Sequence, residues 1–154
     1  MFRTVFTTSV VLAIASAAAL PAFAADLITK TSSHSVPVTM DRLEAAVNSA
    51  GATVFARIDH AAGAEKVDMS LRPTTVLIFG NPALGTPAMV DGQTAGLDLP
   101  LRVLAYADAE GVVHVAYHDP ATMAKDHDLP TDAEYLAKMT GALDKLTSKA
   151  VAED

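Results

Sequence analysis

The sequence predicts an α+β domain in two layers, a mostly antiparallel sheet covered on one face by two long helices. Three apolar runs, at 75–79, 101–107 and 112–117, are separated by Pro, Gly and short polar clusters, as is typical of strands. Amphipathic helical patterns lie before and after this block, at 39–50 and 131–149. The expected order is strand, helix, four strands, helix, because two such helices must cover the sheet to bury their apolar stripes.

The first third of the domain predicts a strand, a helix and a second strand. Residues 27–33 have a period-two texture, and Pro37 ends this strand. Apolar residues then recur at helical spacing over 40–50, with Thr39 as the expected N-cap. Residues 53–60 predict the second strand, with Val54, Ala56, Ile58 and His60 on one face, and a loop or short helix follows.

The middle of the chain predicts a buried strand, a helix and a hairpin. Residues 75–79 show no polar alternation, as expected of a strand covered on both faces or deeply buried on one. Thr86 before Pro87 predicts an N-cap and first helical residue. The loop from Asp108 to Gly111 is too short for a crossover helix, so the two strands that it joins should be antiparallel neighbours.

The end of the chain predicts two helices. Asp119 before Pro120 repeats the pattern of an N-cap and a proline and begins a short helix that runs to Lys125. The stretch 131–134 fits a capping box at the start of the last helix. That helix should turn one apolar stripe toward the sheet, made of Leu136, Met139, Leu143 and Leu146.

Residues 1–24 have the three parts of a secretory signal peptide. Arg3 supplies the positive charge, a short apolar run follows, and Ala-Phe-Ala ends the segment at Ala24. A retained membrane anchor fits less well, because the run is shorter than the roughly 20 residues of a spanning helix and no basic flank follows it. We expect cleavage after Ala24, which leaves one domain over 25–154 in the periplasm or outside the cell.

The composition of the expected mature chain argues against several functions. Without Arg3 the chain has 10 basic and 18 acidic residues, a formal charge of −8, which repels nucleic acid and anionic lipid. The absence of cysteine rules out thiol catalysis and thiolate metal sites. The stretch 80–87, GNPALGTP, lacks the amide donors and the Lys of a phosphate-binding loop. We expect no cofactor, no nucleic-acid partner and no membrane contact after signal cleavage.

Polar side chains near the predicted strand ends form a candidate ligand-binding site. Its members are His60, Arg72, Asn81, Asp59, Asp98, Tyr117 and Asp119. Arg72 can pair bidentately with a carboxylate of a ligand, of Asp59 or of Asp98. The competing interpretation is structural, because Asn and Asp before proline are typical of turns and helix caps.

Two further hypotheses involve histidine. His60, oriented by Asp59, would act as the general base of a hydrolase or isomerase. A metal site made of His60, His118 and Asp119 requires their loops to converge, whereas His114 and His118 lie roughly 13 Å apart along one strand and cannot share an ion. Surface histidines without ligands are the simpler interpretation.

Several stretches resemble one known family. They are RPTTVLIFGNP, GTPAM, LDLPLRVL and AYHDP, with RIDHAAGAEKV upstream, and together they are similar to the domain of unknown function 302 family over about 27–129. The resemblance implies an α+β fold similar to that of the TATA-binding protein, in the order derived above. It supplies no activity, since none is established for the family as a whole.

We therefore expect an exported, non-enzymatic binding or sensing domain whose partner is a small molecule or a protein. A homodimer through a sheet edge or an apolar helix face is one such arrangement. The rival classes are an enzyme based on His60 and Asp59, and a periplasmic metal-binding protein. An enzyme requires His60 in a concave pocket with a second polar group in reach, whereas a binding domain is compatible with an apolar pocket and an exposed His60.

Overall fold

The computed structural model describes residues 27–153, so the predicted signal peptide and its cleavage site lie outside the described residues. The elements in chain order are β1 (Leu27–Ser32), α1 (Val36–Ser49), β2 (Thr53–Asp59), α2 (His60–Glu65), β3 (Thr74–Gly80), α3 (Pro82–Asp91), the 3-10 helix η1 (Gln93–Leu97), β4 (Leu101–Ala107), β5 (Val113–His118), α4 (Thr122–Asp126) and α5 (Glu134–Val151). The predicted order of strand, helix, four strands and helix is confirmed, with α2, α3, η1 and α4 as short additions. Of the helices in this range, none has the length and apolar character needed to cross a membrane.

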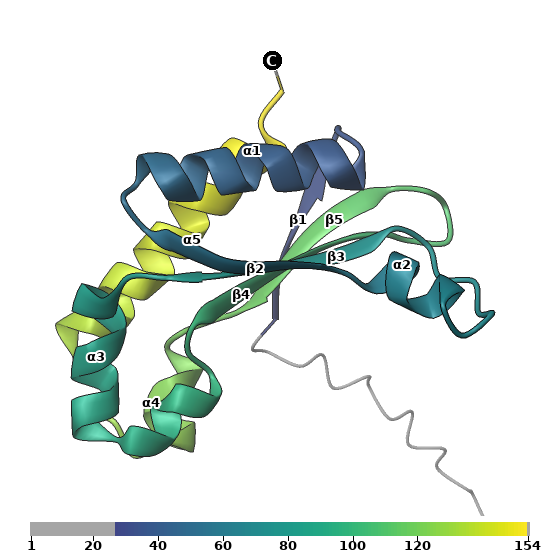
Figure 1. Ribbon diagram of the computed structural model, residues 1–154. Helices are drawn as coiled ribbons and strands as arrows, with labels where there is room; N and C mark the ends of the chain where they lie inside the picture. The colour runs from purple at the N-terminus through teal and green to yellow at the C-terminus, as the bar shows by residue number, and fades with distance from the viewer. Residues whose placement is uncertain (1–26, 154) are drawn as a thin grey trace, which may run out of the picture.

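The five strands form one antiparallel sheet in the order β1-β5-β4-β3-β2. The β4–β5 hairpin pairs Leu104 with Ala116, as the short loop predicted, and Gly111 in that loop has a φ of +81°. The two long helices, α1 and α5, both lie on one face of the sheet (Figure 1). The α+β fold class is therefore confirmed.

The main core lies between these two helices and the sheet. Met40, Leu43 and Val47 of α1 are fully buried against Leu77 of β3, and Leu143 of α5 joins the same cluster. A second cluster lies below, where the predicted stripe of α5 continues through Met139 and meets α3 and α4. Each large apolar side chain buried in this way stabilises the fold by about 1.5–3 kcal/mol. The stripe predicted for the last helix is confirmed.

The second strand differs from the prediction because it contains a β-bulge. The register of β2 against β3 shifts between Val54 and Ala56, so that Val54 and Arg57 face the helices. Ala56 and Ile58 then face the opposite side, and the single face predicted for Val54, Ala56 and Ile58 is wrong. His60 begins α2 instead of ending the strand.

The helix starts were the least accurate predictions. The helix α1 begins at Val36, because Pro37 lies in its first turn, where a missing amide removes no hydrogen bond. Thr39 is not the N-cap but a buried residue inside α1, and its hydroxyl lies 2.8 Å from that of Ser32. The capping box predicted at 131–134 does not form. The N-cap of α5 is Ala133, which makes no side-chain hydrogen bond, and Glu134, the first residue of the helix, pairs with Lys138 instead.

The helix α3 also begins earlier than predicted, at Pro82. The side chain of Asn81 accepts a hydrogen bond from the amide of Ala83 and caps this helix. Thr86 and Pro87 therefore lie inside the helix. The Asn-Pro signal lies upstream of the Thr-Pro signal and starts the helix first, and α3 ends at Asp91 with Gly92 as its C-cap.

Candidate functional site

The face of the sheet that α1 and α5 do not cover holds a broad groove with both polar and apolar lining residues. We call it the sheet-face groove, with a volume of about 640 Å³, and define it by Arg72, Thr74, Asp98, Arg102, Tyr106 and His118. Strands β3, β4 and β5 form its floor through side chains that alternate with those of the core. Three of these polar residues also line a neighbouring cavity.

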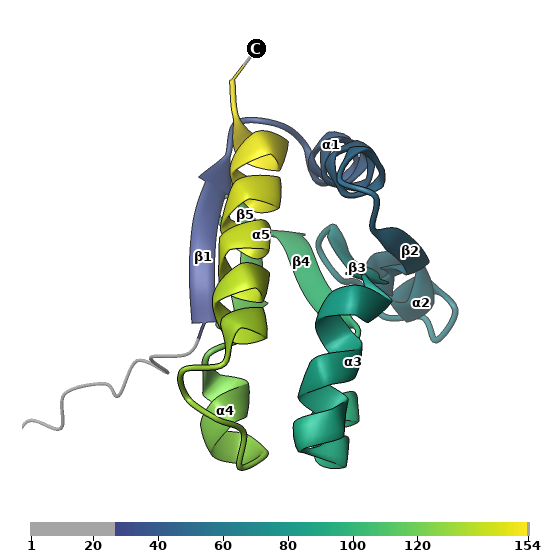
Figure 2. The same ribbon diagram turned by 90° about the vertical axis from the view of Figure 1, so that its left-hand side faces the viewer.

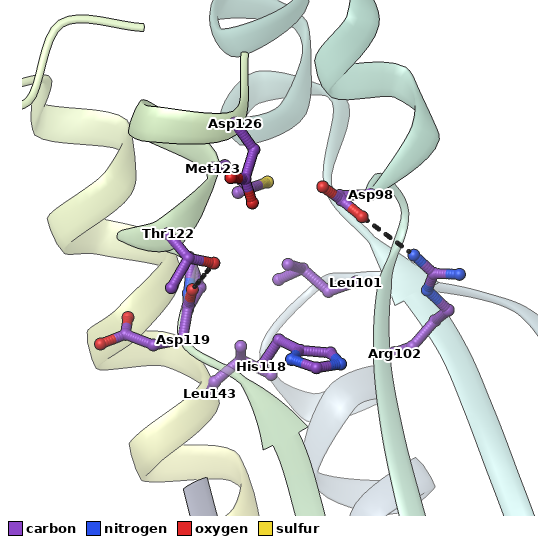
Figure 3. A pocket seen from close by; sticks show the side chains of 10 residues that line it. Asp98, Leu101, Arg102, His118, Asp119, Thr122, Met123, Asp126 and Leu143 are labelled. Carbon is purple, nitrogen blue, oxygen red and sulfur yellow. Dashed lines mark hydrogen bonds and ion pairs between the residues drawn. The ribbon is translucent and has the colours of Figure 1, made fainter. Parts of the chain in front are cut away.

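That neighbour, the acidic cavity, lies between the end of β5, α4 and the start of β4. Its volume is about 280 Å³, and its polar residues are Asp98, Arg102, His118, Asp119, Thr122 and Asp126 around an apolar base of Leu101, Met123 and Leu143. Figure 3 shows Asp98 and Asp126 above Leu101, with the ring of His118 below it. The carboxylate of Asp119 points away from these groups.

Asp119 is held by structural hydrogen bonds. One carboxylate oxygen accepts from the amide of Ala121 at 3.0 Å and from the hydroxyl of Thr140 at 3.1 Å, which ties the start of α4 to α5. Asn81 is therefore a cap residue and Asp119 a turn residue. The predicted N-cap role of Asp119 is wrong, because α4 begins at Thr122 with Ala121 as its N-cap and no side chain caps it.

Asp98 is the best-connected acid of the site. One oxygen lies 3.4 Å from Arg102 Nη2, and the other lies 2.7 Å from His127 Nε2. The second ring nitrogen of His127 lies 3.0 Å from the hydroxyl of Thr94. In the neutral tautomer with the proton on Nε2, His127 donates a hydrogen bond to Asp98 and accepts one from the Thr94 hydroxyl at Nδ1. No local sequence pattern links His127 to Asp98, so the sequence alone does not indicate this pair.

Arg72 makes neither of the ion pairs predicted for it. Its Nε donates to the carbonyl oxygen of Ala107 at 3.0 Å, and it forms no salt bridge with Asp59 or Asp98. Within residues 27–153 its two terminal nitrogens make no hydrogen bond. The donors of this guanidinium therefore remain available in the sheet-face groove.

The remaining predicted residues lie elsewhere. Asp59 caps α2 by accepting a hydrogen bond from the amide of Ala62 at 3.0 Å, and His60 is exposed at the first position of that helix. Neither residue lines any of the three cavities described here. Tyr117 borders the groove but is only 3% exposed and belongs to the main core.

The described residues do not support the metal hypothesis. Across 27–153, no group of three or more His, Asp and Glu side chains lies close enough to hold a metal ion. His60, at the start of α2, and His118, at the end of β5, do not come together with Asp119, so the convergence that this hypothesis required is not found.

A third cavity, the apolar pocket, lies beside α3 and has a volume of about 390 Å³. Its walls are made by Phe55, Leu84, Met89, Leu99, Leu101 and Met139. The only polar side chains in its lining are Asn81 and Thr86, and none is charged. Leu101 borders both this pocket and the acidic cavity, so the two cavities adjoin through one apolar side chain.

The sequence and the fold of this chain are both similar to those of known proteins. Residues 28–146 match the family described as "Domain of unknown function DUF302". This match covers most of the chain, which therefore belongs to that family, as its sequence resemblance implied.

Two curated relatives share the same level of similarity. The "Fluoride-specific ion channel FluC 1" of Brucella suis biovar 1 (strain 1330) is 45% identical over 117 residues, which are 75% of this chain and 46% of that protein. The protein of the same description from Brucella abortus biovar 1 (strain 9-941) is 45% identical over 117 residues, with 43% of its length covered. The chain thus spans less than half the length of these curated relatives.

One solved structure shares the fold. It is described as the "Crystal structure of uncharacterized conserved protein DUF302 from Bacillus stearothermophilus", and the two structures superpose with a TM-score of 0.74. The comparison covers 82% of this chain and 99% of the other at 18% sequence identity. At that identity the comparison supports the fold alone.

Proposed function

We propose that this chain is an exported binding or sensing domain without catalytic activity, and that its partner binds at the sheet-face groove and the acidic cavity. The observation that carries the proposal is that these adjoining cavities share Asp98, Arg102 and His118. Polar groups that converge on a concave surface are what a binding site needs to orient a ligand.

The charges of the site suggest a ligand with two kinds of polar group. The free guanidinium nitrogens of Arg72 and the half-exposed Arg102 offer donors to an anionic or carbonyl group. Asp126, at the opposite end, offers an acceptor to an amine or hydroxyl group. A small zwitterionic molecule, or a protein loop that carries both charges, matches this arrangement.

The enzyme hypothesis has less support than the binding hypothesis. A general base must lie within hydrogen-bond reach of the proton that it removes, in a site that holds the substrate. His60 is exposed at the start of α2, and the carboxylate of Asp59 is engaged by the amide of Ala62. The pair therefore lies outside the cavities in which a substrate would be held.

Native mass spectrometry of untagged protein purified from its own cells tests the binding proposal. We expect a mass above that of the bare chain, from a retained ligand or from a partner, which includes a second copy of the chain. The double variant Arg72→Ala/Arg102→Ala should lose the added mass. Arg57→Ala is the matched control, because Arg57 pairs with Asp41 and Glu44 on the helix-covered side. A bare monomer in the wild type, or equal loss in the control, would contradict the proposal.

The same preparation tests export. Cleavage after Ala24 predicts that N-terminal sequencing of the purified protein begins at Ala25 and that the protein appears in the periplasmic or secreted fraction. A chain that begins at Met1 and stays in the cytoplasmic fraction would contradict this part of the proposal.

A second candidate function follows from the curated relatives, which are named as fluoride-specific ion channels. The chain covers less than half of them, and its described residues contain no helix that could cross a membrane. This chain would then assist a fluoride channel without conducting ions itself. Deletion of its gene should raise sensitivity to fluoride but not to chloride, and unchanged fluoride sensitivity would exclude this role.

A further inference from the structure

The apolar pocket shares only Leu101 with the acidic cavity and no residue with the sheet-face groove. The helix α3 runs beside the first part of α5 (Figure 2). Gly80 at the end of β3 and Leu101 at the start of β4 also line the pocket. Met139 of α5 and Leu101 of β4 contribute from the sheet side, whereas Leu84 and Met89 contribute from α3. The pocket is therefore walled by several separate elements of a rigid scaffold.

The lining of this pocket has no charge, although 19% of the chain is charged. The oxygen of the Asn81 side chain is engaged by the amide of Ala83, whereas its amide nitrogen makes no hydrogen bond within the described residues. The exposed Thr86 hydroxyl is likewise without a partner there. An occupant would meet one or two polar groups on one side and apolar walls elsewhere, which excludes a charged molecule on grounds of desolvation.

Two local features shape the pocket. The bulge of β2 leaves Phe55 between the two registers, and its ring is 57% exposed at the pocket. Gly85 adds no side chain to the wall, and a Cβ built there would lie 3.7 Å from Leu99 Cδ1, in ordinary contact. A Cβ at position 85 is therefore tolerated, and a larger side chain there would occupy space at the pocket wall that Gly85 leaves open.

We propose that this pocket binds a small uncharged aromatic molecule that offers a hydrogen-bond acceptor to Asn81. Its volume of about 390 Å³ lies near the small end of the range of about 300–1,000 Å³ for ligand pockets. Phe55, Met89 and Met139 favour an aromatic ring, because rings stack on Phe and contact thioether sulfur favourably. The inference rests on the proposed binding function and adds a second site to it, together with the class of ligand.

The uncharged fluorescent probe 6-propionyl-2-(dimethylamino)naphthalene, whose carbonyl oxygen is a hydrogen-bond acceptor, tests this assignment with the full chain as purified. We expect saturable one-to-one binding, seen as increased probe fluorescence, and at least tenfold weaker binding by Gly85→Leu. This variant should remain folded, because it replaces a helical glycine by a better helix former. Val90→Leu is the matched control on the same helix: Val90 is 77% exposed and does not line the pocket, so probe affinity should not change.

Three outcomes would overturn the pocket assignment. They are absence of saturable binding, equal affinity in wild type and Gly85→Leu, and probe-independent self-association that Gly85→Leu abolishes in analytical ultracentrifugation. The Arg72→Ala/Arg102→Ala variant separates this proposal from the function proposed above, since it should bind the probe normally. A retained mass that depends on Arg72 and Arg102, without probe binding, would leave the sheet-face function intact and remove the pocket.

Discussion

The Nε2 atom of His127 lies 2.7 Å from a carboxylate oxygen of Asp98, although 29 residues separate them in the sequence. The contact joins the end of α4 to the residue that follows η1. The His127 side chain is 7% exposed and that of Asp98 is 43% exposed, so a buried donor fixes a carboxylate that faces the acidic cavity. One wall of the candidate site is thereby set before any ligand arrives.

Removal of the His127 side chain should therefore destabilise this part of the fold. We expect His127→Ala to lower the free energy of unfolding by about 2–3 kcal/mol, because the hydrogen bonds to Asp98 and Thr94 are both lost. Thermal unfolding followed by circular dichroism measures the change. His118→Ala is the control in the same cavity, since exposed His118 makes no hydrogen bond within 27–153, and its effect should stay within about 0.5 kcal/mol. Equal melting temperatures for the two variants would refute the structural role of His127.

The same wall has a close backbone approach at Gly92. A Cβ on Gly92 would lie 2.7 Å from the carbonyl oxygen of His127 and 2.8 Å from Leu129 Cδ2. Its φ of −148° is open to any residue, so the cost of Gly92→Ala is steric. We expect a loss of about 1–3 kcal/mol in chemical denaturation, as for other overpacked sites.

Gly141→Ala is the matched control for this prediction. Gly141 lies inside α5, and a Cβ there would meet no atom within 4 Å. Ala is the better helix former by about 0.8–1 kcal/mol, so this variant should be more stable than the wild type. The two substitutions should therefore change the free energy of unfolding in opposite directions. A neutral or stabilising Gly92→Ala would show that the backbone after α4 moves to accommodate the added Cβ.

The long helices of this fold were predictable because each carries its own period, as the stripes that contain Leu43 and Leu143 show. Strand β3 was predictable from its apolar run alone, and the structure buries Leu77 while its neighbours in the strand stay partly exposed. The helix starts were not predictable to the residue, since Asn81 and Thr86 each precede a proline and compete as caps. Nor does any glycine or proline mark the bulge that turns Phe55 toward the apolar pocket.

The candidate site was predicted only in part, because its contacts are tertiary. Sequence position alone placed Arg72 and Asp98 near strand ends, and the structure brings both to the sheet-face groove. The partners of these side chains follow from the path of the chain, which places Ala107 beside Arg72 and His127 beside Asp98. Asp59 and His60, although adjacent and chemically suggestive, are directed by the start of α2 away from the cavities.

The β4–β5 hairpin should contribute to acid sensitivity. The hydrogen bond from His114, at 2.7 Å, together with those from the amides of Val112 and Glu110, lowers the pKa of Asp108 below its ordinary value of 3.8. A carboxylate with a lowered pKa stabilises the fold above pH 3.8, and this stabilisation is lost as the pH falls through the folded value. Melting temperatures measured from pH 6 to pH 2 should therefore fall below pH 4 more steeply in the wild type than in Asp108→Asn. Parallel curves would show that Asp108 does not contribute.

A contact between α3 and α5 should make Tyr135 sensitive to alkali. Burial, with a smaller contribution from the hydrogen bond to Asp91 at 2.9 Å and from its negative charge, raises the pKa of Tyr135 from 10.0 to about 12. The neutral phenol is favoured in the folded state, so its contribution to stability is present below pH 10 and is lost as the pH rises toward about 12.

Absorbance at 295 nm, recorded in a Tyr106→Phe/Tyr117→Phe background, isolates the titration of Tyr135. Asp91→Asn should lower the pKa of Tyr135 because the negative charge is removed, yet leave it above 10 because burial is the larger cause. Asp144→Asn is the control, since the carboxylate of Asp144, an acid of α5, contacts Lys30 of β1 and should leave the Tyr135 titration unchanged. A Tyr135 that titrates near 10 in the otherwise wild-type chain would mean that α3 does not stay docked on α5, and the apolar pocket between them would lose one of its walls.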